Sequence, residues 1–262
     1  MPVLGFIGTG NMGSALARAA SRTPENRLLL ANRRREKAEK LAGELHGQVT
    51  DNPGALRADY VFLGVKPQML PEVLLPLASE LAKLDPPPVL VSMIAMTSIG
   101  KVKELSGGAC PVIRIMTNTP VAIGKGITLY ACSEEVTPSQ KEAFLRAMAA
   151  AGRFLKTEEK YIDAGACISG CGPAFVDLFM EALADGGVAC GLPRAMAMEL
   201  AAAMVSGSAE LQLTTGKHPA QLKDEVCSPG GTTIQGVRAL EKGGFRASVM
   251  EAVIAAYERG LK

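Results

Sequence analysis

The chain has 262 residues, of which 48% are hydrophobic and 4% aromatic, and its formal net charge is +2. This length suits one large domain or two modest ones, with ample apolar material for a core. The basic residues form no long run, so the sequence lacks the charge pattern of a nucleic-acid-binding protein. The N-terminus "MPVLGFIGTG" enters a strand-like run directly, and no apolar run reaches the ~18 residues of a membrane-spanning helix. We therefore expect a cytoplasmic protein that binds neither nucleic acid nor membrane.

Histidine and cysteine are used sparingly. The chain has two histidines, His46 and His218, and six scattered cysteines without CxxC spacing. Most of these cysteines lie among small or apolar residues, which favours buried thiols in a reducing compartment. With so few histidines, a zinc site or a Ser-His-Asp triad is disfavoured, and we expect no metal.

The first half of the chain alternates strand-like runs with helix-like stretches. Strands are predicted at 3–8, 27–33, 59–65, 88–95, 111–116 and 126–131. Helices are predicted at 11–22, 35–47, 67–84, 97–105 and 137–152. Because most of the strands are apolar along their whole length, the pattern predicts a mostly parallel, Rossmann-like sheet covered on both faces. The last helix carries a capping box, Thr137 with Gln140, as well as Pro138 in its first turn.

After about residue 160 no further strand-like runs are predicted, and an all-α region follows. The helix predicted at 172–191 places Asp177, Glu181 and Asp185 on one stripe, which is most simply a solvated face. The next helix, 194–213, is apolar almost all round and therefore needs to be buried. About 100 residues of helix offer little depth within one subunit, so we expect an interface with a second copy. The predicted domains are 1–158 and 159–262.

A glycine motif follows the first predicted strand. Gly8, Gly10 and Gly13 have G-x-G-x-x-G spacing and open a helix within a βαβ unit. In dinucleotide-binding domains the first glycine permits the turn, the second admits the pyrophosphate, and the third lets helix pack on strand. A glycine-rich turn without a ligand is the alternative, and the strand–turn–helix context disfavours it.

The end of the second strand bears on the choice of cofactor. An NAD site is expected to have an Asp or Glu there to bind the ribose hydroxyls. This chain instead has Asn32, Arg33, Arg34 and Arg35, which favours the 2′-phosphate of NADP. The alternative is that the arginines are a solvated helix start, which competes well for Arg34 and Arg35 and less well for Arg33.

Further motifs follow the later strands. The segments "GVKP" (64–67), "SMIA" (92–95) and "MTNTP" (116–120) each end a predicted strand. In an open α/β sheet these ends share the edge at which ligands bind, so we expect the segments to line one crevice. Asn52, in "TDNPG", is either a turn residue or part of the same site.

A second glycine-rich junction lies near the C-terminus, in "VCSPGGTTIQGV" (226–237). The simplest interpretation is a turn followed by a helix start, with no ligand. Free backbone N–H groups at a glycine-lined helix start also suit an anion such as a carboxylate.

Taken together, the glycine motif, "GVKP", "MTNTP", "SGCGPAF", "ALADGGVACGLPR" and "SPGGTTI" resemble the pyrroline-5-carboxylate reductase family over essentially the whole chain. The resemblance implies reduction of L-1-pyrroline-5-carboxylate to L-proline with NAD(P)H, the last step of proline biosynthesis. It also implies a Rossmann domain followed by a helical dimerisation domain, with homodimers often assembled into decamers as a pentamer of dimers.

The resemblance also implies particular site residues. The cofactor contacts, with Asn32 added from the strand end, are Ile7, Gly8, Thr9, Gly10, Asn11, Met12, Asn32, Arg33, Asn52, Gly64, Val65, Lys66, Pro67, Met93, Ile94 and Ala95. The substrate contacts are Glu159, Gly231, Thr232 and Thr233, with Thr233 in the catalytic role of orienting and polarising the ring nitrogen. NADP is the expected cofactor, and NAD is the alternative.

Two residues depart from the family pattern, and two other functions compete. Cys171 stands where many relatives have Ser, and Glu225 stands where relatives commonly have an amide that helps to hold the cofactor. Because a carboxylate beside a phosphorylated ribose is unfavourable, Glu225 is left out of the expected site.

Two competing functions are considered. One is a β-hydroxyacid dehydrogenase, which needs a helix-borne Lys–Asn pair that the helices at 172–191 and 194–213 lack. The other is a non-enzymatic NADP-sensing regulator.

Overall fold

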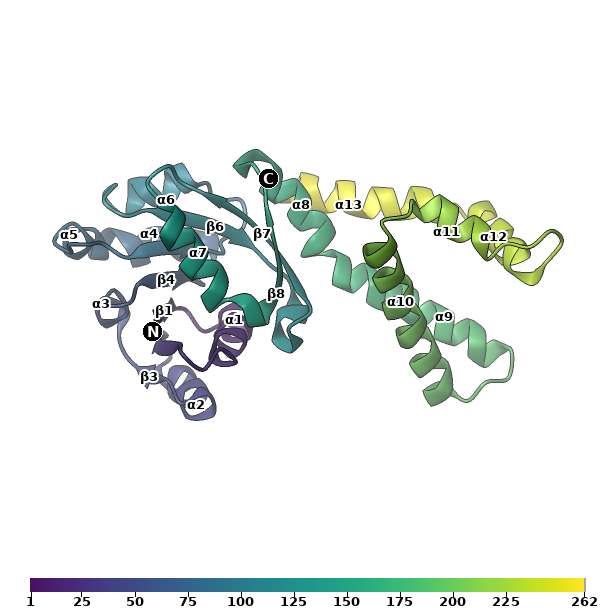
Figure 1. Ribbon diagram of the computed structural model, residues 1–262, viewed down its shortest axis with the longest axis horizontal. Coiled ribbons are helices and arrows are strands. Elements are labelled where there is room, and N and C mark those ends of the chain that lie inside the picture. Colours follow the sequence, from purple (N-terminus) through teal and green to yellow (C-terminus); the bar gives the residue numbers. More distant parts are fainter. Residues whose placement is uncertain (262) are drawn as a thin grey trace. The chain divides into compact units, whose positions relative to one another are not determined.

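The computed structural model describes residues 1–261, which form two compact units (Figure 1). The N-terminal unit contains Met1–Cys171 together with the end of the last helix, from Tyr257 on. The helical unit contains Gly172–Ala256. The division predicted between residues 158 and 159 falls where a short 3-10 turn, Glu159–Tyr161 (η5), begins, and it stays a prediction.

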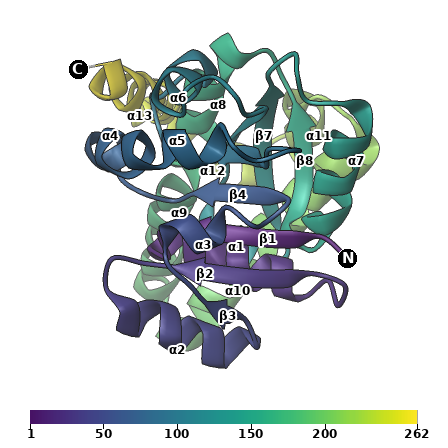
Figure 2. The same cartoon turned by 90° about the vertical axis from the view of Figure 1, so that its left-hand side faces the viewer.

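The N-terminal unit is built on one eight-stranded sheet with the order β3-β2-β1-β4-β5-β6-β7-β8. Its strands are β1 (Val3–Ile7), β2 (Arg27–Ala31), β3 (Gln48–Val49), β4 (Tyr60–Leu63), β5 (Val89–Ser92), β6 (Val112–Met116), β7 (Gly126–Cys132) and β8 (Gly152–Lys156). All neighbours are parallel except β6 and β7, which confirms the predicted mostly parallel sheet. Figure 2 shows β2, β1 and β4 side by side. Strands β3 and β8 are not among those predicted from the sequence.

Eight helices accompany this sheet. They are α1 (Asn11–Ser21), α2 (Arg35–Leu45), α3 (Asn52–Ala55), α4 (Leu70–Leu74), α5 (Ala78–Leu81), α6 (Ile99–Leu105), α7 (Pro138–Ala147) and α8 (Ile162–Ser169). The capping box of α7 is present: Thr137 N donates to Gln140 Oε1 at 2.9 Å, and Gln140 N donates to Thr137 Oγ1 at 3.2 Å.

The helix predicted over 67–84 is helical over most of its length, but it is not one continuous α-helix. The segment consists instead of α4 and α5 with the 3-10 turns η1 (Pro67–Met69) and η2 (Leu75–Leu77). Pro71 and Pro76 cause the breaks, because proline has no N–H to donate and its ring clashes with the preceding turn. Leu70, Leu74, Leu77 and Leu81 remain buried, so the apolar face of the segment is kept.

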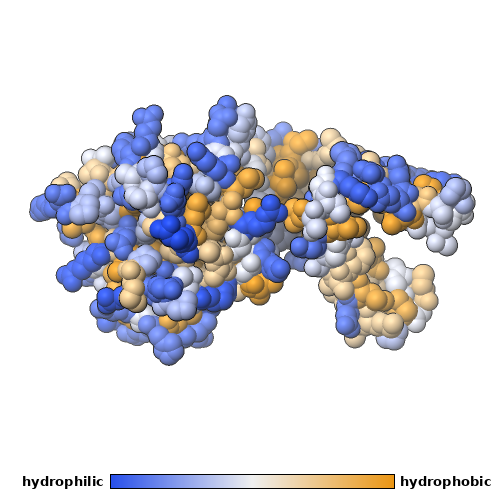
Figure 3. Space-filling model, viewed as in Figure 1, coloured by the Kyte–Doolittle hydropathy of each residue, from blue (hydrophilic) through white to orange (hydrophobic). Residues whose placement is uncertain are grey.

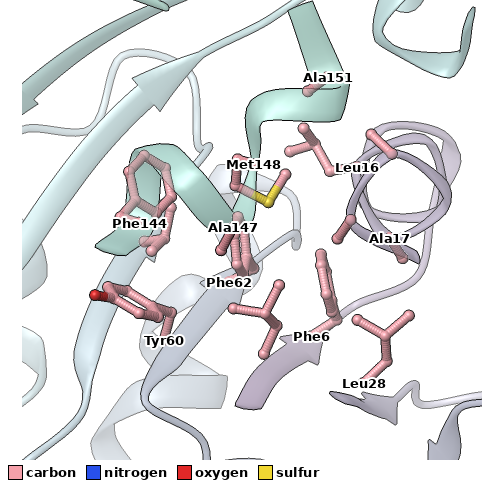
Figure 4. Packing of buried hydrophobic residues seen from close by; sticks show 14 of the residues in the cluster. Phe6, Leu16, Ala17, Leu28, Tyr60, Phe62, Phe144, Ala147, Met148 and Ala151 are labelled. Carbon is pink, nitrogen blue, oxygen red and sulfur yellow. The ribbon is translucent and has the colours of Figure 1, made fainter. Parts of the chain in front are cut away.

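Alternate strand residues enter two separate cores, one on each face of the sheet. On β4, Tyr60 and Phe62 join the core formed with α1, α2 and α7, whereas Val61 and Leu63 join the core formed with α4, α5 and α6. Figure 4 shows the first core, in which Phe6 stacks on Phe62 with ring centroids 4.5 Å apart. Burial on both faces explains why these strands read as continuous apolar runs.

The helical unit contains α9 (Gly172–Ala189), α10 (Arg194–Thr215), α11 (Pro219–Glu225), α12 (Thr232–Lys242) and most of α13 (Phe245–Leu261). Helices α9 and α10 pack closely: a Cβ added at Gly187 would lie 3.2 Å from Ala197 Cβ. Of the residues of α10, only Ala197 and Ala201 are buried within the chain. The large apolar residues exposed on this helix are Met196, Met198, Leu200, Met204, Leu211 and Leu213. Orange surface over α9 and α10 in Figure 3 shows the same excess of exposed apolar side chains.

One helical stretch passes a length and hydropathy test for membrane spans. Glu159–Ala189 has 31 residues and a mean hydropathy of 1.3 in its most apolar window. No such stretch was predicted from the sequence, because Asp163 and Asp177 interrupt the apolar run while its mean hydropathy stays high. Length and hydropathy alone do not distinguish a membrane helix from a helix that is buried between subunits.

All six cysteines are free thiols. Cys110 and Cys167 are buried, and burial raises the pKa of the Cys110 thiol to about 11. Cys171 and Cys190 are exposed in the single chain, so the expectation of mostly buried thiols is not met there. Both lie at the ends of α9, whose surface is largely uncovered within one chain.

Candidate active site

The glycine motif forms a tight turn between β1 and α1. Gly8 has φ +97°, a conformation that favours glycine. A Cβ at Gly13 would lie 2.2 Å from Gly8 O, and a Cβ at Gly64, just after β4, would lie 2.5 Å from the same oxygen. At Gly10, by contrast, a Cβ would meet nothing within 4 Å. Two glycines of the motif are therefore needed for packing, and the third borders open space through which a ligand can approach.

The start of α1 suits an anion. Gly10 is its N-cap and supplies no side-chain cap, and the first turn contains no acidic residue. The free N–H groups and the positive end of the helix dipole therefore favour a negatively charged group. Thr9 Oγ1 is buried without a hydrogen-bond partner in the described part of the chain, which is a further free polar atom in this turn.

Two of the predicted cofactor residues have side chains that are buried in the core. Ile7 and Ile94 are each 1% exposed and belong to the apolar core. Any contact they make with a ligand would come from their main chain. Asn11 is exposed and Met12 is half-buried at the start of α1.

The end of β2 presents unpaired arginines. Asn32 is half-buried, and Arg33 and Arg34 are exposed with no ion pair to any of residues 1–261. Arg35 is different, since its Nε lies 2.9 Å from Glu39 Oε1 one helical turn later. Arg33 and Arg34 are thus free to bind a phosphate, whereas Arg35 serves α2.

The remaining predicted cofactor residues follow the carboxyl ends of β3, β4 and β5. Asn52 opens α3, which Asp51 caps by accepting from Gly54 N at 2.7 Å. After β4, Gly64 and Val65 are half-buried, whereas Lys66 and Pro67 are exposed; after β5, Met93 is half-buried and Ala95 is exposed. These strands are parallel, so the segments share one edge of the sheet with the glycine turn.

The segment "MTNTP" does not offer its polar side chains to this edge as expected. Thr117 Oγ1 accepts a hydrogen bond from Thr128 Oγ1 at 2.8 Å, and both residues are buried. Asn118 Nδ2 donates to Ser169 O at 3.0 Å, and its Oδ1 accepts from Ile127 N at 3.1 Å. These side chains tie β6, β7 and α8 together.

Glu159 lies in an ionic cluster that the sequence analysis did not predict. Its Oε1 accepts from Ile99 N at 2.6 Å and lies 3.4 Å from Arg114 Nη1. Asp163 Oδ1 accepts from Arg114 Nη2 at 2.5 Å and from Met96 N at 3.2 Å. No sequence motif links these residues, although an arginine inside the apolar strand "PVIRIM" is a signal that a buried partner is needed.

The "SPGG" junction forms a tight turn into α12, as its composition predicts. Gly231 N donates to Ser228 O at 3.0 Å, and Gly230 has φ +69°. Gly231 is the N-cap of α12, with no side-chain cap and no acidic residue in the first turn. Thr232 and Thr233 are exposed in this first turn. Glu225 is paired with Lys217, with 2.7 Å between Oε1 and Nζ.

No cluster of three or more His, Cys, Asp or Glu side chains able to hold a metal ion occurs among residues 1–261. At the glycine turn, at the end of β2 and at the start of α12, the predicted site residues offer backbone N–H groups, hydroxyls and basic side chains, which are suited to binding anions.

The fold and the glycine turn define a Rossmann-type dinucleotide-binding domain, joined to a helical unit with a large uncovered apolar surface. A family model described as "NADP oxidoreductase coenzyme F420-dependent" matches residues 3–96, and one described as "Pyrroline-5-carboxylate reductase dimerisation" matches residues 159–262. Since the exposed surface of α9 and α10 lies in this dimerisation region, the protein is a homo-oligomer.

Comparisons over the whole chain agree. A pyrroline-5-carboxylate reductase of Glycine max is 42% identical, covering 98% of this chain and 94% of its own. The crystal structure of Plasmodium falciparum pyrroline carboxylate reductase with NADP bound has a TM-score of 0.88 at 32% identity, covering 99% of this chain and 98% of its own. The Streptococcus pyogenes 1-pyrroline-5-carboxylate reductase has a TM-score of 0.88 at 30% identity, with the same coverage of both chains. The chain belongs to the pyrroline-5-carboxylate reductase family.

Proposed function

We propose that the glycine turn after β1 and the start of α12 are the two binding sites of an enzyme that reduces L-1-pyrroline-5-carboxylate to L-proline. This reaction is the last step of proline biosynthesis, and the enzyme is an oxidoreductase that uses NADP(H). Membership of the family over the full chain supports this activity. The proposal about the sites is carried by one observation: the chain has a glycine-capped, acid-free helix start at α1 and another at α12.

The residues at the carboxyl edge of the sheet fit a dinucleotide. Gly8, Gly10 and the first turn of α1 would hold the pyrophosphate, because Gly10 borders open space and no side chain of residues 1–261 caps the N–H groups of this turn. Arg33 would bind the 2′-phosphate, since a guanidinium matches phosphate oxygens and this one has no carboxylate partner among residues 1–261. We therefore propose a preference for NADPH over NADH. When bound, the reduced nicotinamide supplies the hydride that adds to the imine carbon.

The substrate combines a carboxylate with a cyclic imine. The N–H groups of Thr232 and Thr233 would bind the carboxylate, because they stand at the start of α12 without a side-chain cap. The Gly231 N–H, expected from the sequence to share this role, already donates to Ser228 O at 3.0 Å. The Thr233 hydroxyl would hydrogen-bond the ring nitrogen, which fixes the ring and stabilises the charge that changes there during reduction. A threonine hydroxyl is a poor acid, so the proton on nitrogen is left to the protonated imine or to water.

Of the predicted substrate residues, Glu159 has one carboxylate oxygen that is already engaged within the protein. Its Oε1 is engaged by Ile99 N and Arg114, whereas Oε2 has no protein donor among residues 1–261. A substrate contact by Glu159 would therefore use Oε2. Its side chain is 33% exposed, which leaves this oxygen accessible.

Larger assembly and location are inferred from the same family. We propose a homodimer formed through the region 159–262, and a decamer of five dimers as the larger assembly. The proposed location is the cytoplasm, where NADPH and the reducing environment that free thiols need are both present.

A coupled assay with L-1-pyrroline-5-carboxylate and NADPH tests the activity directly. Thr233→Ala and Thr233→Val should each lower turnover by about 10–1000-fold, as expected for loss of one donor to a developing charge. Thr232→Ala is the matched control and should have a milder effect, because only its backbone N–H is used. Wild-type turnover in both Thr233 variants would remove the role assigned to the hydroxyl, and absence of any imine reduction by the wild-type protein would remove the proposed function.

A further inference from the structure

The loop between β5 and α6, residues 93–98, is bound to the rest of the N-terminal unit through its backbone. It contains three of the predicted cofactor contacts, Met93, Ile94 and Ala95. Met96 has φ +55°, a left-handed conformation that is uncommon for a residue other than glycine. Such a conformation is unfavourable and persists only where surrounding contacts hold it.

Two carboxylates from a distant segment hold this loop. Met96 N donates to Asp163 Oδ1 at 3.2 Å, at the residue with positive φ. Ile99 N, in the first turn of α6, donates to Glu159 Oε1 at 2.6 Å. The two acids therefore hold the loop at Met96 and just after its end at Ile99, from a segment about 60 residues later in the chain.

Arg114 forms an ion pair with each of the two acids. It lies on β6 beside Ser92, the last residue of β5, and its side chain is 3% exposed. Its guanidinium contacts Asp163 and Glu159 at once. A buried charge is stable only when it is paired, so the position of Arg114 depends on the acids as much as theirs depends on it.

The end of α13 also contacts the loop. A Cβ added at Gly260, near the end of α13, would lie 3.1 Å from Met96 Sδ. Met96 is thus held by a hydrogen bond to its N–H and by backbone packed against its side chain. These parts all belong to the N-terminal unit.

The loop lies on the nicotinamide side of the proposed cofactor site. The pyrophosphate is centred on β1, and the adenosine half extends toward β2, where Arg33 stands. The other half of a dinucleotide must then extend across β4 toward β5, which is two strands, or about 9–10 Å, from β1. Residues 93–98 follow the end of β5.

We propose that Arg114, Glu159 and Asp163 are positioning residues, which fix loop 93–98 so that its main chain can bind the nicotinamide half of the cofactor. This inference rests on the proposed cofactor site. Asp163 acts through the Met96 N–H and does not itself contact cofactor or substrate. Losing Asp163 releases the left-handed residue and unbalances Arg114, so the loop loses the shape that the nicotinamide half needs.

The proposal is tested by comparing the binding of the complete cofactor with the binding of its adenosine half alone. Isothermal titration with NADP⁺ and with adenosine 2′,5′-bisphosphate, which lacks the nicotinamide half, would be measured for wild-type protein, Asp163→Ala and Asp163→Asn. Asp163→Ala should weaken NADP⁺ binding about 10-fold, as expected for loss of a charge-assisted hydrogen bond, and leave the bisphosphate unchanged. Asp163→Asn should be intermediate, because its amide oxygen can still accept from Met96 N. It also serves as the test if the alanine variant does not fold.

The control variant is Glu158→Gln, which removes an exposed carboxylate of the same segment that pairs with Lys160. It should bind both ligands as the wild type does. Wild-type affinity for NADP⁺ in both Asp163 variants, or equal weakening of NADP⁺ and bisphosphate, would overturn the positioning role. If the wild-type protein bound neither ligand, the proposed cofactor site itself would fail, so the two failures are distinguishable.

Discussion

Replacing Gly10 or Gly13 by alanine should separate binding of the cofactor from stability of the turn that binds it. At Gly13 the new Cβ would lie 2.2 Å from Gly8 O, so α1 must move away from β1. Overpacking of this kind costs about 1–3 kcal/mol. For a unit of this size, that corresponds to a fall in Tm of about 2–12 °C.

At Gly10 the same substitution meets nothing within 4 Å, and φ −72° with ψ −169° is available to alanine. Stability should therefore change by less than about 1 kcal/mol, the difference between glycine and alanine at an N-cap. The methyl group would instead occupy the open side of the turn, where the pyrophosphate is proposed to approach. Losing one charge-assisted hydrogen bond weakens binding by about 10–150-fold.

Thermal unfolding of the cofactor-free variants and fluorescence titration with NADPH measure the two effects separately. We expect Gly10→Ala to keep the wild-type Tm and lose NADPH affinity, and Gly13→Ala to lose Tm. The reasoning is refuted if Gly10→Ala binds NADPH as tightly as the wild type, since the open space would then not be the path of the pyrophosphate. Wild-type Tm in Gly13→Ala would show that the close contact relaxes at no cost.

Three further predictions concern specificity, assembly and pH. Arg33→Asp should lower the NADPH-to-NADH efficiency ratio by about 10–150-fold, mainly through KM, whereas Arg35→Ala should leave it unchanged because Arg35 pairs with Glu39; equal efficiency of the wild type with both cofactors would contradict this. Light scattering should show a dimer or larger assembly, with an interface above ~2,000 Å². The double variant Leu200→Glu and Met204→Glu should be monomeric, and its persistence as an oligomer would exclude this face of α10 as the interface. Burial raises the pKa of Tyr60 to about 12, so between its ordinary value of 10.0 and 12 the unfolded chain loses a proton that the folded chain keeps. The free energy of unfolding should therefore fall as pH rises over this range, and Tyr60→Phe should reduce the slope; an unchanged slope would mean that Tyr60 titrates normally.

Much of the N-terminal unit follows from local sequence. The apolar strands, the helix starts and the capping box at Thr137 depend on residues no more than about four apart, so their pattern is visible in the chain. The same is true of the glycine turn after β1 and of the "SPGG" turn before α12, because positive φ at Gly8 and Gly230 is a requirement of the local backbone. Local patterns therefore identified the two helix starts at which anions are proposed to bind.

Local patterns failed where the outcome depends on what lies across the fold. The prediction of one helix at 67–84 took no account of Pro71 and Pro76. The spacing of the leucines lets them pack against the sheet whether or not the helix is continuous. Strand β8 is fixed by close approach to β7, where a Cβ at Gly152 would lie 2.3 Å from Gly126 O. Nothing in the sequence around Gly152 reveals this contact.

The sequence by itself determined the fold class, the glycine turns and the family, since each is encoded in short motifs and their order along the chain. Only the tertiary structure decided that Gly10 borders open space while Gly13 is packed, that Arg35 is paired while Arg33 is free, and that Arg114 joins Glu159 and Asp163. Arg114 and Asp163 are 49 residues apart in the chain, and Met96 and Asp163 are 67 apart. A buried charge requires a partner but does not specify where in the chain that partner lies, so such pairs emerge only when the strands and helices that carry them are packed together.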